Sequence, residues 1–291
     1  MSSHLLIFGF GYTAHFLAKK MQQIKSKVTA TTRNNDALDS DCTFDCEVIH
    51  FSEKNIEKAL TTATHILVST PPAHNIGDPV LNTVGHLLKK YINNIRWVGY
   101  LSSTSVYGDH QGLWVDEFSK PKMLGEQGKL RFSAEIQWIS FAQIHQLPLN
   151  IFRLAGIYGP QRNVLARLIA GKKDTIVKDG HFFSRIHVED IVLAIAVAMQ
   201  YPKPGVSIYN VADDEPTPGD VVDKYAASLL QLPPLHEIAY EIAVLSPMAK
   251  EFYLHNKRIS NAKLKKELDI QLTYPTYKEG LAHLLHNEDY L

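Results

Sequence analysis

Three small residues near the N-terminus have the spacing that dinucleotide binding requires. Gly9, Gly11 and Ala14 lie in the segment LLIFGFGYTA, between an apolar run and a stretch typical of a helix. In this pattern the first glycine permits a sharp turn, the second lets the backbone approach a pyrophosphate, and the alanine lets the helix pack closely on the strand before it. The helix N-terminus, at Tyr12 and Thr13, offers N–H groups and a partial positive charge to phosphates. We therefore expect these residues to bind a dinucleotide, although such glycines also mark ordinary tight turns.

The residues after the second apolar segment bear on which dinucleotide binds. The segment KVTATT predicts a strand that ends in Thr32 and is followed by Arg33 and Asn34. An Asp or Glu at this point binds the ribose hydroxyls of NAD, whereas an arginine suits the 2′-phosphate of NADP through charge-assisted hydrogen bonds. We therefore predict NADP as the cofactor, with NAD as the less favoured choice. In the alternative, Arg33 is a solvated loop residue and Asp36 or Asp39 reaches the ribose.

Length and composition exclude several classes of function. The chain has 291 residues, of which 45% are hydrophobic and 21% charged, and its 30 Lys+Arg balance its 30 Asp+Glu. This balance favours neither a nucleic-acid partner nor a membrane partner. The two cysteines, Cys42 and Cys46, are not spaced as C-x-x-C, and the histidines show no metal-ligand pattern, so we expect no metal. Without a signal peptide or a membrane-length apolar run, the expected location is the cytoplasm.

Strand and helix signals alternate through the first half of the chain. After the first two strands we expect further strands near 47–51, 65–69, 96–101 and 150–154, with helices near 12–21, 53–63, 80–91 and 130–145. This alternation predicts an α/β fold, a Rossmann-type doubly wound parallel sheet with a smaller C-terminal substrate lobe. Residues 1–159 are expected to form mainly the dinucleotide-binding domain and residues 160–291 mainly the substrate lobe. Segments near 185–211 are expected to return to the first domain.

Thr70 and Pro71 follow the predicted strand near 65–69. In open α/β sheets, ligands bind at the carboxyl ends of the strands. We therefore include both residues among the candidate cofactor contacts. In the alternative reading they form a plain loop, because proline ends a strand in any case.

A series of short motifs runs along the rest of the chain. In order they are SSTSVYG at 102–108, DE at 116–117, YGPQR at 158–162, RIHVEDI at 185–191, YNV at 209–211 and SNAKL at 260–264. Together with the Gly-rich turn, their order and spacing resemble the extended short-chain dehydrogenase/reductase family, the NAD(P)-dependent epimerase/dehydratase group. The resemblance covers nearly the whole chain. It implies hydride transfer to or from a nicotinamide, with Ser103 orienting the substrate oxygen.

The chain departs from that family at its acid/base pair. The family's tyrosine stands eight residues before a helical glutamate, with a lysine four residues after the tyrosine. Counting back from Glu135 places Gln127 and Arg131 at these two positions. Glutamine does not exchange a proton at useful rates and arginine is always charged, so we expect an atypical branch. Tyr107 is then the nearest phenol to Ser103, although Tyr107 also suits a packing role and Ser103 a turn.

Basic residues in the second half suggest where an anionic substrate group would bind. The family's nucleotide-sugar members often carry an arginine at the position that Phe183 occupies here. Arg162, Arg185 and the Lys257-Arg258 pair are candidates for an anion pocket instead. The alternative is that these are surface charges of a neutral protein.

Three functions remain open from the sequence. The first is an atypical NAD(P)-dependent oxidoreductase or epimerase-like enzyme for a small carbonyl or sugar-like substrate. The second is a non-catalytic NADP-binding sensor or regulatory protein, and the third a lyase or isomerase without net redox chemistry. Fold alone does not choose among them. The expected partner is a small-molecule substrate, and the resemblance implies a homodimer.

Overall fold

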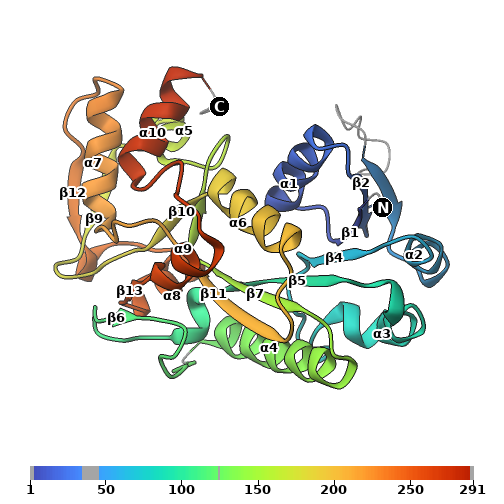
Figure 1. Ribbon diagram of the computed structural model, residues 1–291. Helices are drawn as coiled ribbons and strands as arrows, with labels where there is room; N and C mark the ends of the chain where they lie inside the picture. Colours follow the sequence, from blue (N-terminus) through green and yellow to red (C-terminus); the bar gives the residue numbers. More distant parts are fainter. Residues whose placement is uncertain (1–2, 35–45, 124, 289–291) are drawn as a thin grey trace. The chain divides into compact units, whose positions relative to one another are not determined.

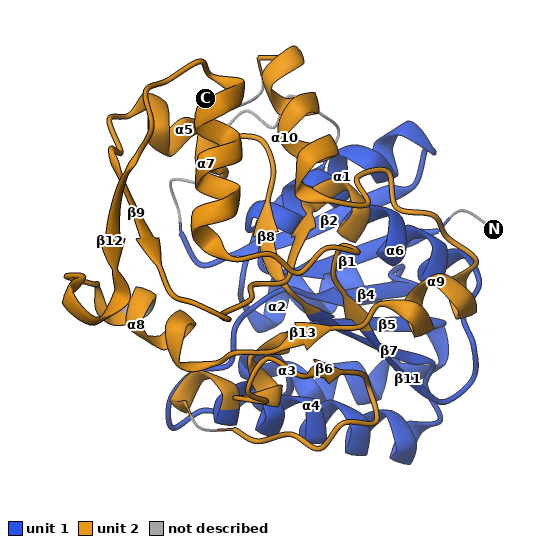
Figure 2. Ribbon diagram, turned by 90° about the vertical axis from the view of Figure 1, so that its left-hand side faces the viewer, with its two compact units in different colours: residues 1–103, 129–153, 192–209 blue, residues 104–128, 154–191, 210–291 orange. Residues whose placement is uncertain are grey.

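The computed structural model describes residues 3–34, 46–123 and 125–288. The chain forms two compact units and passes between them several times (Figure 2). Unit 1 comprises residues 1–103, 129–153 and 192–209, and unit 2 comprises residues 104–128, 154–191 and 210–291. The domain division near residue 159 that the sequence suggested stays a prediction. Each unit is described by itself below.

A seven-stranded sheet organises unit 1, with the strand order β11-β7-β5-β4-β1-β2-β3 among the described residues. The pairs β1–β2, β1–β4, β2–β3 and β4–β5 are parallel. The strands are β1 (His4–Phe8), β2 (Lys27–Thr32), β3 (Glu47–His50), β4 (His65–Val68), β5 (Trp97–Ser103), β7 (Leu149–Leu154) and β11 (Val206–Val211). This confirms the Rossmann-type α/β fold, in which the order reverses beside the first strand.

Helices cover both faces of this sheet (Figure 1). They are α1 (Tyr12–Gln23), α2 (Glu53–Leu60), α3 (Pro79–Lys90), α4 (Glu126–His145) and α6 (Val188–Gln200), with the short 3₁₀ turn η2 (Ile92–Asn94). Figure 1 shows α2, α3 and α4 on one face and α1 on the other. The first group shares one apolar cluster with inward-facing strand residues; its members include Leu6, Phe8, Ile56, Leu60, Val68, Val84, Tyr100 and Trp138.

Local sequence explains where these helices begin. Asp78 caps α3, because its Oδ1 accepts hydrogen bonds from Val80 N at 3.0 Å and Leu81 N at 2.9 Å, and Pro79 occupies the first turn. Ser52 caps α2 in the same way. The helix α4 begins at Glu126, earlier than the predicted residue 130, so both Gln127 and Arg131 lie on it.

The described residues of unit 2 include three small parallel strand pairs. They are β8 (Gly156–Tyr158) with β10 (Arg185–His187), β9 (Asp174–Val177) with β12 (His236–Ala239), and β6 (Trp114–Val115) with β13 (Arg258–Ile259). The remaining elements are η3 (Thr104–Tyr107), α5 (Val164–Ile169), α7 (Gly219–Leu229), η4 (Tyr240–Ile242), α8 (Pro247–Leu254), α9 (Ala262–Leu268) and α10 (Tyr277–His286). Helices α5, α7 and α10 share an apolar core.

Close packing fixes the last helix of unit 2. A side chain at Gly280 of α10 would place its Cβ 2.7 Å from ring carbons of Tyr158, so only glycine fits there. Thr276 and Glu279 form a reciprocal capping box at the start of α10. Across the described residues of both units, no helix is long and apolar enough to span a membrane.

Candidate functional site

The turn between β1 and α1 requires glycine at its first position. Gly9 has φ +90°, a conformation that residues with side chains rarely adopt. A Cβ at Gly9 would lie 2.9 Å from Thr70 Cγ2 and 3.2 Å from Thr70 N. Gly9 N donates a hydrogen bond to Thr31 Oγ1 at 3.0 Å. The ends of β2 and β4 therefore hold this turn on two sides.

The second glycine of the motif borders open space. Gly11 is the N-cap of α1, and no heavy atom of the described residues lies within 4 Å of where its Cβ would be. In the same described part of the chain, no side chain caps this helix, and its first turn carries no acidic residue. The first N–H groups of a helix need partners from outside the helix. A helix start of this kind suits an anion, and the binding of one at Gly11, Tyr12 and Thr13 stays a prediction.

Thr70, at the same edge of the sheet, carries a polar atom without a partner in the described residues. Its Oγ1 is buried and has no hydrogen-bond partner among the described residues, although its methyl group packs beside Gly9. A buried hydroxyl without a partner costs about 1–3 kcal/mol, which a ligand's polar atom would remove. Pro71 follows it and is exposed. These residues fit a bound dinucleotide.

The end of β2 is exposed and polar. Thr32 Oγ1 accepts a hydrogen bond from Asn34 N at 3.1 Å, which forms a tight turn, and Arg33 between them is exposed. Asp36 and Asp39, the alternative ribose ligands, lie outside the described residues, as does Cys42. The preference for NADP over NAD stays a prediction.

A buried ion pair underlies the end of β5. Arg153 donates to both carboxylate oxygens of Glu135, through Nε at 3.0 Å and Nη2 at 2.7 Å. Ser102 donates to the same carboxylate at 2.5 Å. Arg131 lies one turn before Glu135 on α4, and its Nη1 donates to the carbonyl of Leu101 at 2.9 Å. These contacts fix the backbone that leads into Ser103, which is half-buried at the last position of β5.

Tyr107 in unit 2 is held inside the protein. It is fully buried, and its hydroxyl donates to Asn210 Oδ1 at 2.7 Å. Asn210 is itself fixed by Glu117 and by the carbonyl of Ser260. Gln127, the residue at the family's tyrosine position, is exposed. This geometry favours a structural role for Tyr107.

The two candidate substrate arginines differ in their surroundings. Arg185 is partly buried, and its Nη1 donates to the carbonyls of Phe183 and Thr217, both at 2.9 Å. Arg162 is exposed in the turn before α5, where its backbone pairs with Gly159. Arg185 therefore ties two backbone segments together, whereas Arg162 lies at the surface.

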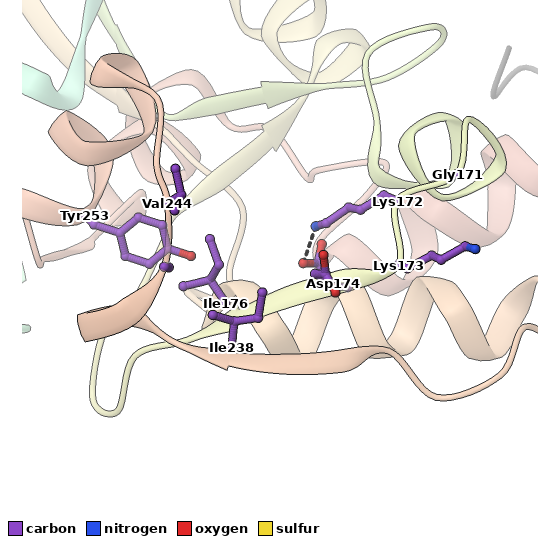
Figure 3. A pocket seen from close by; sticks show the side chains of 10 residues that line it. Gly171, Lys172, Lys173, Asp174, Ile176, Ile238, Val244 and Tyr253 are labelled. Atoms are coloured by element: carbon purple, nitrogen blue, oxygen red, sulfur yellow. Dashed lines mark hydrogen bonds and ion pairs between the residues drawn. The ribbon is translucent and has the colours of Figure 1, made fainter.

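A pocket in unit 2 was not visible in the sequence (Figure 3). Its volume is ≈ 480 Å³. One wall carries an ion pair between Lys172 Nζ and Asp223 Oδ2 at 2.5 Å. Figure 3 shows Ile176, Ile238 and Tyr253 on the other side. Sequence reasoning missed it because its residues come from separate elements and form no local motif.

Comparisons with known proteins identify the family of this chain. The NAD dependent epimerase/dehydratase family matches residues 5–212. This chain belongs to that family. The family resemblance noted in the sequence is thereby confirmed, whereas the atypical branch stays a prediction.

One curated relative and two solved structures are similar to this chain. Protein YeeZ of Escherichia coli strain K12 is 34% identical over 175 residues, which cover 58% of this chain and 60% of the relative's length. A functionally unknown conserved protein from Silicibacter pomeroyi DSS is 42% identical and has a TM-score of 0.91, with 98% of this chain and 99% of that chain covered. The dTDP-glucose 4,6-dehydratase of Bacillus anthracis, at 19% identity, TM-score 0.77 and coverage of 99% and 98%, shares the fold.

Proposed function

We propose that unit 1 binds a nicotinamide dinucleotide, with NADP preferred, and that the chain is an atypical oxidoreductase or epimerase-like enzyme for a small carbonyl or sugar-like substrate. The turn at Gly9, the uncapped helix start at Gly11 and the orphaned hydroxyl of Thr70 support cofactor binding. The B. anthracis dehydratase is described in complex with NAD, which supports the same class of cofactor here.

Each residue has a part in this proposal. The amides after Gly11 bind the pyrophosphate, Thr70 donates to the cofactor, and Arg33 binds the 2′-phosphate with Thr32 and Asn34 beside it. When bound, the cofactor supplies or accepts a hydride. Ser103 donates a hydrogen bond to the substrate oxygen and so polarises the carbonyl.

The proposal also has to name a source for the proton. The hydroxyl of Tyr107 is buried and bonded to Asn210, so in our proposal water or the substrate supplies the proton. Arg131 bonds the carbonyl of Leu101 and remains charged, so its role is to position the end of β5. General acid/base groups contribute about 10²–10⁴-fold, and turnover without them is correspondingly slow.

A second function has its own supporting observation. With Gln127 exposed and Arg131 bonded to a backbone carbonyl, the family's acid/base pair is missing at these positions. A non-catalytic NADP-binding sensor would need no such pair. The alternative is thus a protein that binds the cofactor and reports its state.

One experiment separates the two functions. NADPH fluorescence is titrated first with the full chain and then followed during a screen of aldehydes, ketones and sugar nucleotides. Turnover that Ser103→Ala removes supports the enzyme. Saturable NADPH binding without turnover supports the sensor, and no binding of either NADPH or NADH contradicts both.

A further inference from the structure

Two histidines begin neighbouring strands at the amino edge of the sheet in unit 1. His4 is the first residue of β1 and His65 the first residue of β4, and the parallel pairing of these strands aligns Leu5 with His65. The exposed fractions of the two histidines are only 4% and 9%. This edge lies at the opposite end of β1 from Gly9. Neither ring belongs to the cofactor site proposed above, so their burial needs an explanation of its own.

The contacts of His4 indicate where its ring carries a proton. Its Nε2 lies 2.9 Å from Thr29 Oγ1, and that hydroxyl donates to a carboxylate oxygen of Glu47 at 3.1 Å. A hydroxyl has a single proton and a carboxylate only accepts, so Thr29 accepts its hydrogen bond from the ring. The proton of the neutral ring is therefore on Nε2. Its Nδ1 is then an acceptor.

The hydroxyl of Thr62 is placed to serve both charge states of His4. It lies 2.9 Å from Nδ1 of the ring and 3.5 Å from the carbonyl oxygen of Ala59. When the ring is neutral, the hydroxyl donates to Nδ1. When Nδ1 takes up a proton, the ring becomes the donor and the hydroxyl can turn to the carbonyl of Ala59. The ring nitrogen and the hydroxyl thus keep a hydrogen bond to each other in either state.

His65 repeats this arrangement on the next strand. Its Nδ1 lies 2.8 Å from Thr64 Oγ1, which also lies 3.4 Å from the carbonyl oxygen of His4. The backbone N of His4 donates to the same hydroxyl at 3.1 Å. Each ring therefore has its own threonine, and each threonine has a backbone carbonyl as a second acceptor. The repetition on adjacent strands indicates a common role.

Burial lowers the pKa of both rings below the ordinary value for histidine. At His4, the charge of Lys27 on β2 adds to the effect of burial on the pKa, whereas a backbone hydrogen bond and the charge of Glu47 on β3 oppose it. At His65, the charge of Arg96 just before β5 adds to the lowering of the pKa. Both rings are therefore mostly neutral at pH 7 and take up protons in a more acidic range.

We propose that His4 and His65 form a pair of reversible proton switches at the amino edge of the sheet. In each switch, uptake of one proton on Nδ1 turns a threonine hydroxyl from the ring to a backbone carbonyl. At His4 the new charge is linked to the carboxylate of Glu47 through the hydroxyl of Thr29. The folded chain can then charge these buried rings without leaving Nδ1 unpaired, which would cost about 1–3 kcal/mol for each ring. This inference does not depend on the proposed function.

The first test uses nuclear magnetic resonance of the full chain, with its histidines labelled with nitrogen-15. The pH is lowered from about 7.5 to about 5 and then raised again. His4→Asn and His65→Asn identify the two signals. The neutral rings should carry their proton on Nε2, and both signals should move toward the charged form and return. A neutral His4 that carries its proton on Nδ1 overturns the proposal, as does a ring that takes up its proton only when the chain unfolds.

The second test removes one hydroxyl at a time and keeps the shape of the side chain. Thr62→Val should lower the pKa of His4 by about 0.5 or more, because the charged ring loses an acceptor, and should leave His65 unchanged. Thr64→Val should do the reverse. Thr61→Val is the matched control, because the hydroxyl of Thr61 is exposed and bonds a helix carbonyl instead of a ring. Equal pKa values of His4 in wild type and Thr62→Val overturn the proposal. If the valine variants do not fold, the titration of the wild type decides.

Discussion

The Gly9 turn and the amino edge of the sheet in unit 1 are built from opposite kinds of groups. At Gly9 the polar groups are backbone amides and the hydroxyls of Thr31 and Thr70, and the space is set by glycines. At the amino edge they include the rings of His4 and His65, whose pKa values burial has lowered. The first site depends mainly on the shape of its backbone. The second depends on protonation, so it should respond to pH rather than to side-chain size.

The largest expected effect is a loss of stability when the shape of the first site is changed. Gly9→Val places a branched side chain at positive φ against Thr70. The free energy of unfolding should fall by about 2–4 kcal/mol, measured by urea denaturation. Gly11→Val is the matched control, because its side chain enters open space. Its stability should change by less than about 0.5 kcal/mol, whereas NADPH binding should weaken at least tenfold, about 1.4 kcal/mol. Equal stability losses in both variants would contradict this geometry.

The next effect concerns the one charge predicted to act at the first site. Arg33→Ala removes the proposed contact with the 2′-phosphate, which is worth about 1.5–3 kcal/mol. NADPH should therefore bind about 10- to 100-fold more weakly, and NADH binding should hardly change. Fluorescence titrations of wild type and Arg33→Ala with NADPH and with NADH measure these affinities. A wild-type preference for NADH, or equal losses for both, refutes the role of Arg33.

A pH titration contrasts the amino edge with His181 of unit 2, a buried ring whose Nε2 has no hydrogen-bond partner among the described residues. Because the pKa of His181 is about 4 when folded and near 6.5 when unfolded, the unfolded chain binds more protons as pH falls below 6.5. His181 should therefore cost about 1–2 kcal/mol of stability at pH 5 relative to pH 7.5. Urea denaturation of wild type and His181→Asn at both pH values measures this. If the free energy of unfolding of His181→Asn changes between the two pH values as much as that of the wild type, His181 does not stay neutral on folding.

The smallest expected effect tests whether the hydroxyl of Tyr107 has a structural or a catalytic role. Tyr107→Phe removes the hydrogen bond to Asn210 and should lower stability by about 1 kcal/mol. Any turnover should survive the change. If turnover falls more than tenfold while stability is unchanged, the Tyr107 hydroxyl serves in catalysis instead.

The sequence was sufficient for features that depend on neighbouring residues. The spacing of Gly9 and Gly11 predicts the strand–turn–helix, because the turn, the close approach and the helix start all lie within a few residues. The strand β2 has the predicted bounds because its apolar alternation is uninterrupted. Whether these residues bind a dinucleotide is still a prediction.

Features that depend on distant residues were beyond the sequence. The hydrogen bond from Tyr107 to Asn210 joins residues 103 positions apart, and no local pattern predicts it. The same holds for the bond from Arg185 to the carbonyl of Thr217, 32 positions away. The catalytic role of Tyr107 and the substrate role of Arg185 stay predictions. The contact of the His4 ring with a threonine 58 positions away likewise follows from packing among segments that no local motif relates.

The hydrogen bonds of His4 have a consequence for synthesis of the chain. They reach Thr62 across 58 positions and Thr29 across 25. Loops of such lengths close at similar costs, since the entropy lost on closure rises only slowly with loop length. Every group of the two switches is synthesised before Thr104, the first residue of unit 2. A chain halted on the ribosome at Ser103 would therefore already contain all the residues that we propose to take up protons.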